Sequence, residues 1–319
     1  MRSVEEMRTS FSGLTMLLIT PMKDNFDLDL EGVRKNVRFL LDNGVREGKE
    51  KVILTPGAGF GEGVYLSLEE HKKVVKTILD EVDGEVPVFP GIHLGGSLEA
   101  EKYCKELQDM GVAGIQLAPP SSYMSPTDDE IVAYYKGIAK AAPKLGFIVY
   151  NTHWEWARPP DRDMTPDLLG RLHEIPNFVG IKWTSKTLMN FIDGLHEHAG
   201  KAAYLNSYGF EMAILLHMMG GRGMVVNQVA PWYSLNLWSL LEERKYIEAW
   251  NEIERWPSRW YRLQREIVKE GKNWVAVSKG LVEVTGGYAG PPRPPQTRIT
   301  RDQYKRIEDL VKKSGIMEH

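Results

Sequence analysis

The sequence has very little cysteine, since Cys104 is the only one in 319 residues. A single cysteine excludes disulfides within the chain and the cysteine clusters of structural zinc sites. The histidines do not compensate, because His173, His196 and His198 fall in helical patterns and the H-E-x-x-H arrangement is absent. We therefore expect no metal ion in this protein.

A dinucleotide-binding pattern is missing as well. The stretch from Gly57 is rich in glycine, but a G-x-G-x-x-G pattern started there meets Glu62 at its last position. The same pattern started at Gly59 meets Val64. The sequence thus predicts that the protein works without a cofactor.

Long apolar runs and basic clusters are also absent. No stretch of about 18 apolar residues is present to span a bilayer, and residues 1–10 are charged, so no signal peptide is visible. The 40 basic and 43 acidic residues give a net charge of −3. They are spread along the chain, without the basic and aromatic patches typical of nucleic-acid binding. We expect a cytoplasmic protein that binds a small molecule and neither membrane nor nucleic acid.

What is present is ordinary globular composition, 42% hydrophobic and 26% charged, with enough apolar material for one large core. From Gly13 onward, eight short β-rich runs alternate with longer amphipathic segments. The predicted strands are Leu14–Ile19, Lys51–Leu54, Val86–Pro90, Gly114–Leu117, Phe147–Tyr150, Val179–Lys182, Ala202–Leu205 and Gly223–Val226.

The segments between these strands have helical periodicity. They are Leu30–Asn43, Leu68–Val82, Leu98–Met110, Asp128–Ala141, Pro166–His173, Leu188–His198, Phe210–Met219 and Ser234–Glu243. Eight strand-helix units with short connections favour an α/β fold of the (β/α)₈ TIM-barrel type over an open sheet. After Glu243 the alternation stops, so we predict a catalytic barrel over residues 1–244 and a C-terminal helical region over 245–319.

A lysine and a tyrosine end two neighbouring strands of this predicted barrel. Lys182 closes the short apolar run 177–185, and Tyr150 ends the strand before it. Burial of an ammonium group lowers its pKa, so such a lysine is partly the free amine and can attack a carbonyl. Each residue also has an ordinary structural explanation. A lysine at a strand end can extend to solvent, and a buried tyrosine can simply satisfy its hydroxyl in the core.

Taken together, the two side chains suggest Schiff-base chemistry on a 2-oxo acid. Lys182 would form the imine, and Tyr150 would transfer protons beside it. The backbone N–H groups of Gly57, Ala58, Gly59, Phe60 and Gly61 would form a nest for the substrate carboxylate.

The chain resembles the dihydrodipicolinate synthase and N-acetylneuraminate lyase family of class I, Schiff-base-forming aldolases. The resemblance rests on Gly61-Glu62 with Leu66-Ser67-Leu68-Glu69-Glu70, on Tyr150-Asn151, on Gly180-Ile181-Lys182, on Asn227 with Pro231, and on Gly290-Pro291-Pro292-Arg293-Pro294-Pro295. It implies that Lys182 forms the imine, that Tyr150 relays protons, and that the protein is a homotetramer.

Departures from the family pattern bear on the substrate. Gly59 and Phe60 stand where the family usually has two threonines, and the synthase's substrate-binding arginine is missing after Tyr150. The aromatic residues near the expected site suggest apolar walls. The alternative interpretation is that they pack at the mouth of the barrel or at a subunit contact. The predicted substrate-binding residues are Gly57, Ala58, Gly59, Phe60, Gly61, Asn151, His153, Trp154, Trp156 and Asn227.

Four functions remain open on the sequence. A lyase that releases pyruvate from a larger, partly apolar 2-oxo acid is favoured, either an aldolase or a hydratase-aldolase. A dehydratase or deaminase of a 2-oxo sugar acid is the second hypothesis, with His153 and Glu155 as acid and base. Dihydrodipicolinate synthase itself and a non-catalytic small-molecule binder are the other two. Retention of both Lys182 and Tyr150 argues against the binder.

Overall fold

The protein is represented by a computed structural model that describes residues 3–120, 126–152, 163–207 and 209–318. Its eight strands form one sheet in the order β2-β1-β8-β7-β6-β5-β4-β3. Strands adjacent in sequence are neighbours except β2 and β3, which lie at the two ends of this order, and the first strand lies beside the last. The pairs from β3 to β8 are parallel. This order belongs to a (β/α)₈ barrel and not to an open doubly wound sheet, which confirms the predicted fold class. The strands are β1 Gly13–Leu17, β2 Val52–Thr55, β3 Gly91–Ile92, β4 Gly114–Leu117, β5 Gly146–Thr152, β6 Phe178–Thr184, β7 Ala203–Asn206 and β8 Gly223–Asn227.

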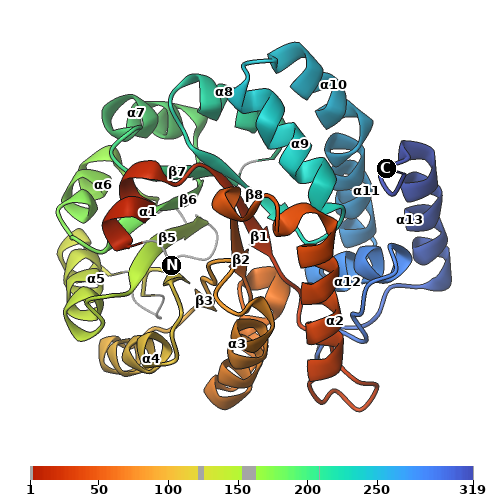
Figure 1. The fold of residues 1–319 in the computed structure, drawn as a ribbon, viewed down its shortest axis with the longest axis horizontal. Coiled ribbons are helices and arrows are strands. Elements are labelled where there is room, and N and C mark those ends of the chain that lie inside the picture. Colours follow the sequence, from red (N-terminus) through yellow and green to blue (C-terminus); the bar gives the residue numbers. More distant parts are fainter. Residues whose placement is uncertain (1–2, 121–125, 153–162, 208, 319) are drawn as a thin grey trace. The chain divides into compact units, whose positions relative to one another are not determined.

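Helices follow the strands in chain order (Figure 1). Their starts carry the expected caps: Ser67 forms a capping box with Glu70, and Thr165 caps a helix whose first residue is Pro166. The helices up to the last strand-helix unit are α1 Val4–Ser10, α2 Leu30–Leu40, α3 Leu68–Val82, α4 Ser97–Asp109, α5 Asp128–Ala141, α6 Pro166–His173, α7 Leu188–His198, α8 Glu211–Met218 and α9 Pro231–Glu242. The C-terminal helices are α10 Tyr246–Arg255, α11 Pro257–Lys269, α12 Trp274–Val284 and α13 Arg301–Ser314.

The third strand lies later in the chain than predicted. It spans Gly91–Ile92, whereas the apolar run Val86–Pro90 was expected to form it. Pro87 and Pro90 have no N–H to donate, so they are poor members of a ladder. The carbonyl of Pro90 accepts from the Gln116 N–H at 2.9 Å, and regular pairing begins at Gly91 opposite Gln116.

Two further helical features were not specified by the sequence interpretation. Residues 4–10, noted only for their charge, form α1, which Ser3 and Glu6 start with a capping box. The helical stretch 246–269 is divided at Trp256, which has φ −127° and ψ −71° and is followed by Pro257. A proline cannot supply the N–H that would continue the preceding helix, so α11 begins there.

The described chain forms two compact units. One contains Met1–Thr15 and Pro87–Val225, and the other Met16–Val86 and Val226–His319. In the first, α1 packs against β6 and β7. In the second, α11, α12 and α13 pack against one another, as Figure 1 shows in blue. No helix within the described ranges is long and apolar enough to cross a membrane. The predicted division at residue 244 stays a prediction.

Candidate active site

Lys182 and Tyr150 lie opposite each other on the paired strands β6 and β5 (Figure 1). The Nζ atom of Lys182 lies 3.7 Å from the centroid of the Tyr150 ring. The two residues are only 5% and 6% exposed. Their predicted placement, an amine beside a phenol at equal height on adjacent strands, is thus confirmed. An amine and a phenol in contact, both largely removed from water, are suited to carbonyl addition with proton transfer.

The backbone around Lys182 is held tightly. All seven residues of β6 are buried. At Gly180 an added Cβ atom would lie 2.1 Å from the carbonyl oxygen of Ala203, so only glycine allows β6 to approach β7 this closely. Trp183, the residue after the lysine, is completely buried against Phe191 and Tyr204, with ring centroids 5.2 and 6.0 Å apart respectively. This packing confines the strand on which Lys182 lies.

His93 joins this pair from the end of β3. Its ring makes an edge-to-face contact with Tyr150, with the centroids 5.1 Å apart and the planes at 75°. Sequence reasoning missed His93 because the predicted third strand ended at Pro90, so the histidine was not placed at a strand end. With the strand at Gly91–Ile92, His93 is the first residue after it.

Asn151 and Asp163 form a polar contact next to Tyr150. The Asn151 side chain, which is fully buried, donates from Nδ2 to Asp163 Oδ1 at 2.7 Å. The amide nitrogen of Asn151 is therefore engaged by another side chain of the protein, that of Asp163. Asp163 was not singled out from the sequence, and no sequence motif marks it, since its partners come from β5 and from the segment after β6.

The glycine-rich stretch forms a tight turn after β2. Gly61 N–H donates to Ala58 O at 2.7 Å, and Glu62 N–H donates to Gly59 O at 3.2 Å. Gly57 has φ +69°, and a Cβ atom there would lie 2.0 Å from His71 Nε2, so the position requires glycine. Phe60 is half-buried in the 3-10 segment Gly59–Gly61.

A buried ion pair supports this turn. Glu62 has a left-handed backbone, and its Oε2 atom lies 2.5 Å from Nζ of Lys279 on α12. Burial lowers the pKa of Lys279, and the charge and hydrogen bond of Glu62 oppose that effect. The Arg293 N–H donates to Glu62 Oε1 at 2.7 Å. The Arg293 guanidinium makes two 2.8 Å hydrogen bonds to Glu70, which lower the pKa of that carboxyl to about 2.

Of the remaining predicted site residues, the structure describes only Asn227. Asn227 ends β8, and its Oδ1 accepts from Val229 N–H at 3.1 Å. His153, Trp154 and Trp156 lie outside the described residues. No group of three or more histidine, cysteine, aspartate or glutamate side chains within the described part of the chain is placed to hold a metal ion.

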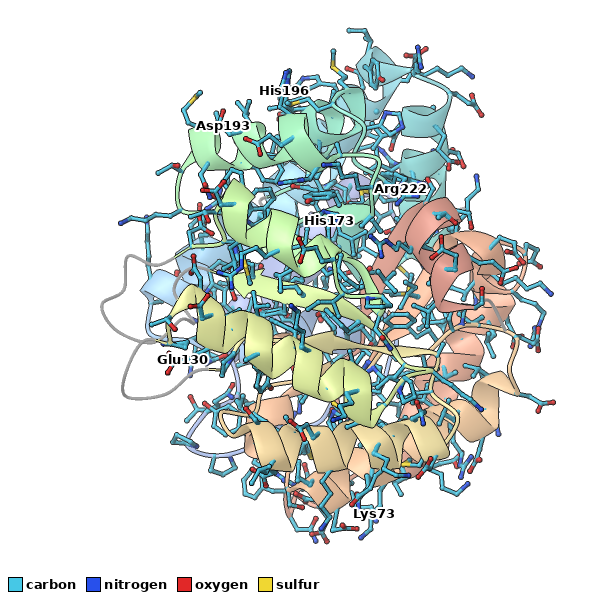
Figure 2. The ribbon with its side chains drawn as sticks, turned by 90° about the vertical axis from the view of Figure 1, so that its left-hand side faces the viewer. Lys73, Glu130, His173, Asp193, His196 and Arg222 are labelled. Atoms are coloured by element: carbon cyan, nitrogen blue, oxygen red, sulfur yellow. The ribbon has the colours of Figure 1, made fainter. Side chains whose placement is uncertain are left out.

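The helical histidines have structural contacts. His173 Nε2 lies 3.0 Å from the Tyr204 hydroxyl, and His198 Nε2 lies 2.8 Å from the Pro166 carbonyl oxygen. His173 and His198 are buried, whereas His196 is exposed. Figure 2 shows Asp193 and His196 along α7, with His173 below them in the view. All three lie in helices, as their sequence patterns predicted.

Comparison with known proteins shows similarity over nearly the whole chain. A sequence model of the dihydrodipicolinate synthetase family matches residues 10–314. The 4-hydroxy-tetrahydrodipicolinate synthase of Archaeoglobus fulgidus is 28% identical over 309 residues, which cover 95% of this chain and 98% of that protein.

Solved structures of similar fold include two enzymes. A catalytic lysine mutant of Ruminococcus gnavus sialic acid aldolase has a TM-score of 0.83 and 18% identity, and the match covers 100% of this chain and 99% of that one. A chloride-inhibited dihydrodipicolinate synthase from Acinetobacter baumannii, complexed with pyruvate, has a TM-score of 0.81 and 23% identity. That match covers 96% of this chain and 99% of the other.

Proposed function

The chain belongs to the dihydrodipicolinate synthetase family, and we propose that it is a lyase whose Lys182 forms an imine with a 2-oxo acid that carries a pyruvyl group. The contact between Lys182 Nζ and the Tyr150 ring, at 3.7 Å, carries this proposal. A curated relative that matches 95% of the chain is named 4-hydroxy-tetrahydrodipicolinate synthase, and one solved structure of similar fold is a complex with pyruvate.

The proposed reaction begins with addition of the Lys182 amine to the substrate ketone. Loss of water from the carbinolamine gives a protonated imine, which withdraws electrons from the neighbouring carbon. The hydroxyl on the next carbon gives its proton to Tyr150, and the bond between the two carbons breaks so that the tail leaves as an aldehyde. The electron pair of the broken bond moves into the imine to give an enamine. Protonation of the enamine carbon and hydrolysis then release pyruvate and the free lysine. Tyr150, in contact with the amine, donates and accepts the protons of the carbinolamine and of the departing oxygen.

The carboxylate of the 2-oxo acid is assigned to the loop 57–61. In this loop the N–H groups of Gly61 and Glu62 close the tight turn, and the N–H groups from Ala58 to Phe60 come just before them. Backbone N–H groups in such a turn attract an anion. The threonine pair usual in the family is replaced by Gly59 and Phe60. Asn227, which ends β8, is kept as a further substrate contact in this proposal.

The favoured reaction is carbon-carbon cleavage of a 2-oxo acid with an apolar tail. Phe60, Trp154 and Trp156 would form the apolar wall. The names of the curated relatives favour a second candidate, condensation of pyruvate with aspartate semialdehyde. The missing arginine and threonines argue against it, because the second substrate's carboxylate would lose its charged partner.

The imine is tested by adding borohydride together with pyruvate. Reduction should attach pyruvate covalently to the wild-type protein at Lys182, which mass spectrometry of a proteolytic digest locates. Lys182→Ala should acquire no label, while Lys186→Ala, an exposed lysine four residues later, should be labelled like the wild type. Equal labelling of Lys182→Ala would show that another amine reacts.

The substrate is tested with a panel of 2-oxo acids that differ only in the tail. Each well-buried ring or branched group should favour the apolar substrate by about 1.5 to 3 kcal/mol, which is about tenfold or more in kcat/KM. Trp154→Ala and Trp156→Ala should reduce this preference while leaving borohydride trapping of pyruvate intact. A preference for polyhydroxylated tails would support the sugar-acid dehydratase, and efficient use of aspartate semialdehyde would support the synthase.

A homotetramer belongs to the same proposal, because the family resemblance implies it. A monomeric dihydrodipicolinate synthase variant is among the solved structures of similar fold, so assembly is not uniform among similar proteins. Light scattering coupled to gel filtration should give four times the chain mass of 36.3 kDa. A mass of one or two chains would contradict this part of the proposal.

A further inference from the structure

The Asp163 carboxylate accepts five hydrogen bonds, all from within one compact unit of the chain. Oδ1 accepts from Asn151 Nδ2 at 2.7 Å and from Met164 N–H at 2.8 Å. Oδ2 accepts from Lys186 N–H at 2.6 Å, from Asn190 Nδ2 at 3.1 Å, and from the Ser185 hydroxyl in a short contact. A carboxylate has about four lone-pair sites, so Asp163 is used to capacity as an acceptor.

These donors come from the ends of the two strands that carry the candidate catalytic pair. Asn151 directly follows Tyr150 on β5, and Ser185 lies three residues after Lys182, just beyond β6. The parallel ladder between these strands ends with Thr152 opposite Thr184. At this end of the ladder the Asp163 carboxylate joins the two strands, since one oxygen binds Asn151 and the other binds Ser185.

The network is reinforced by α7. Asn190, in the first turn of this helix, also donates from Nδ2 to Ser185 Oγ at 3.0 Å and to Met164 O at 2.8 Å. Thr187 caps the helix, and Lys186 directly before the cap gives its N–H to Asp163. A negative charge beside a helix N-terminus is stabilised by the helix dipole and by the unsatisfied N–H groups there.

We propose that Asp163 is a positioning residue for the reaction, which holds Tyr150 and Lys182 at their working separation through Asn151 and Ser185. Successive strand residues point to opposite faces, so Asn151 leaves the sheet on the side opposite Tyr150. Asp163 therefore acts without touching the substrate. This inference rests on the proposed function, since it assumes that the pair is catalytic. A displacement of about 1 Å in such a pair can cost roughly 10²-fold in rate.

The test uses a reaction that needs no knowledge of the second substrate. An imine of pyruvate that loses a methyl proton to form the enamine, and regains one from solvent, exchanges its methyl hydrogens for deuterium in D₂O. Proton NMR follows this exchange, and borohydride trapping separately reports imine formation. Together they separate the proton-transfer step from the initial addition.

Asp163→Asn keeps the shape of the side chain but places an NH₂ group where donors now point. It should slow methyl exchange by about 10- to 100-fold. Imine trapping should fall less, because the lysine is held by β6 itself. Asp167→Asn, an exposed aspartate on α6 four residues later, is the matched control and should exchange at the wild-type rate. Thermal unfolding of each variant shows whether the fold is retained.

A double-variant cycle with Tyr150→Phe separates positioning from general damage to the fold. If Asp163 acts through Tyr150, then Asp163→Asn should add little further loss once the phenol hydroxyl is gone. If the rate losses of the two single variants multiply fully in the double variant, the inference is overturned. Methyl exchange at the wild-type rate in Asp163→Asn would overturn it as well. If Asp163→Asn does not fold, Asn151→Ala and Ser185→Ala each remove one of the contacts of Asp163. Methyl exchange at the wild-type rate in both of these variants would also overturn the inference.

The two proposals fail in different ways. If the wild type forms no adduct with pyruvate and borohydride, the proposed function is wrong. If the wild type is trapped at Lys182 and Asp163→Asn exchanges like the wild type, only the positioning role is wrong.

Discussion

At the scale of single residues, Tyr150 has the most informative surroundings. The Nζ atom of Lys182 lies over its ring, 3.7 Å from the centroid, and the His93 ring meets it edge to face. These two contacts, one on the face and one at the edge of the ring, restrict its rotation. The hydroxyl is therefore carried on a ring held by two neighbours.

Replacement of Tyr150 by phenylalanine tests the role of the hydroxyl alone. Tyr150→Phe keeps the ring and its two contacts, so the protein should still fold. Methyl exchange of pyruvate should slow by about 10²- to 10⁴-fold, the usual contribution of one positioned proton-transfer group. Tyr135→Phe, whose buried hydroxyl donates to Leu117 O at 3.0 Å, is a control outside the pair. Near-normal exchange in Tyr150→Phe would remove it from the mechanism.

At the scale of elements, one buried ion pair connects the turn after β2 with α12. Glu62 and Lys279 are 0% and 1% exposed. Lys279 Nζ also donates to Pro291 O at 2.8 Å, and Arg293 N–H binds the other oxygen of Glu62. The charges are thus paired and hydrogen-bonded, which is the condition under which buried charges are tolerated. The turn assigned to the substrate carboxylate depends on this contact with a C-terminal helix.

Lys279→Met should destabilise the protein by about 3 to 5 kcal/mol, because it leaves the Glu62 charge buried without its ionic partner. Urea unfolding measures this loss. Lys51→Met is the matched control, since Lys51 pairs with Glu242 at 2.5 Å with 40% and 29% of the side chains exposed, and should cost less than about 1 kcal/mol. Adding Glu62→Gln to Lys279→Met should restore part of the loss. Equal costs of the two lysine variants would contradict the importance of the buried pair.

At the scale of the whole molecule, a buried histidine makes stability depend on pH. Burial lowers the pKa of His173 from 6.5 to about 3, with smaller contributions from the charges of His198, Arg8 and Lys201. The folded protein therefore keeps this imidazole neutral at pH values where the unfolded chain protonates it. Below pH 6.5 the unfolded state binds the extra proton, so the free energy of unfolding falls with pH until about pH 3.

His173→Gln should remove this dependence. Between pH 7.5 and 5.0 the wild type should lose about 2 kcal/mol of unfolding free energy relative to the variant, at 1.36 kcal/mol for each pH unit below 6.5. Urea unfolding at several pH values measures the difference. His196→Gln, the exposed histidine on α7 in Figure 2, should follow the wild type. Parallel curves for the wild type and His173→Gln would show that the histidine is not responsible.

The sequence by itself determined the order and nature of nearly all elements, because periodicity and caps are local. The limits of α3, α5, α6 and α7 agree with prediction, and each is amphipathic or carries a capping residue at its start. The adjacency of Tyr150 and Lys182 followed as well. Parallel strands that follow one another in a barrel pair side by side, so residues at equal heights meet.

Only the tertiary structure decided contacts that join distant segments. Prolines concealed the true place of β3, and so His93 beside Tyr150 was missed. No sequence pattern indicated that Lys279 pairs with Glu62. None indicated that Asp163 accepts hydrogen bonds from five donors. Local patterns report which face of an element is apolar. They do not report which polar side chains meet once the chain is folded, because those contacts depend on the three-dimensional path between them.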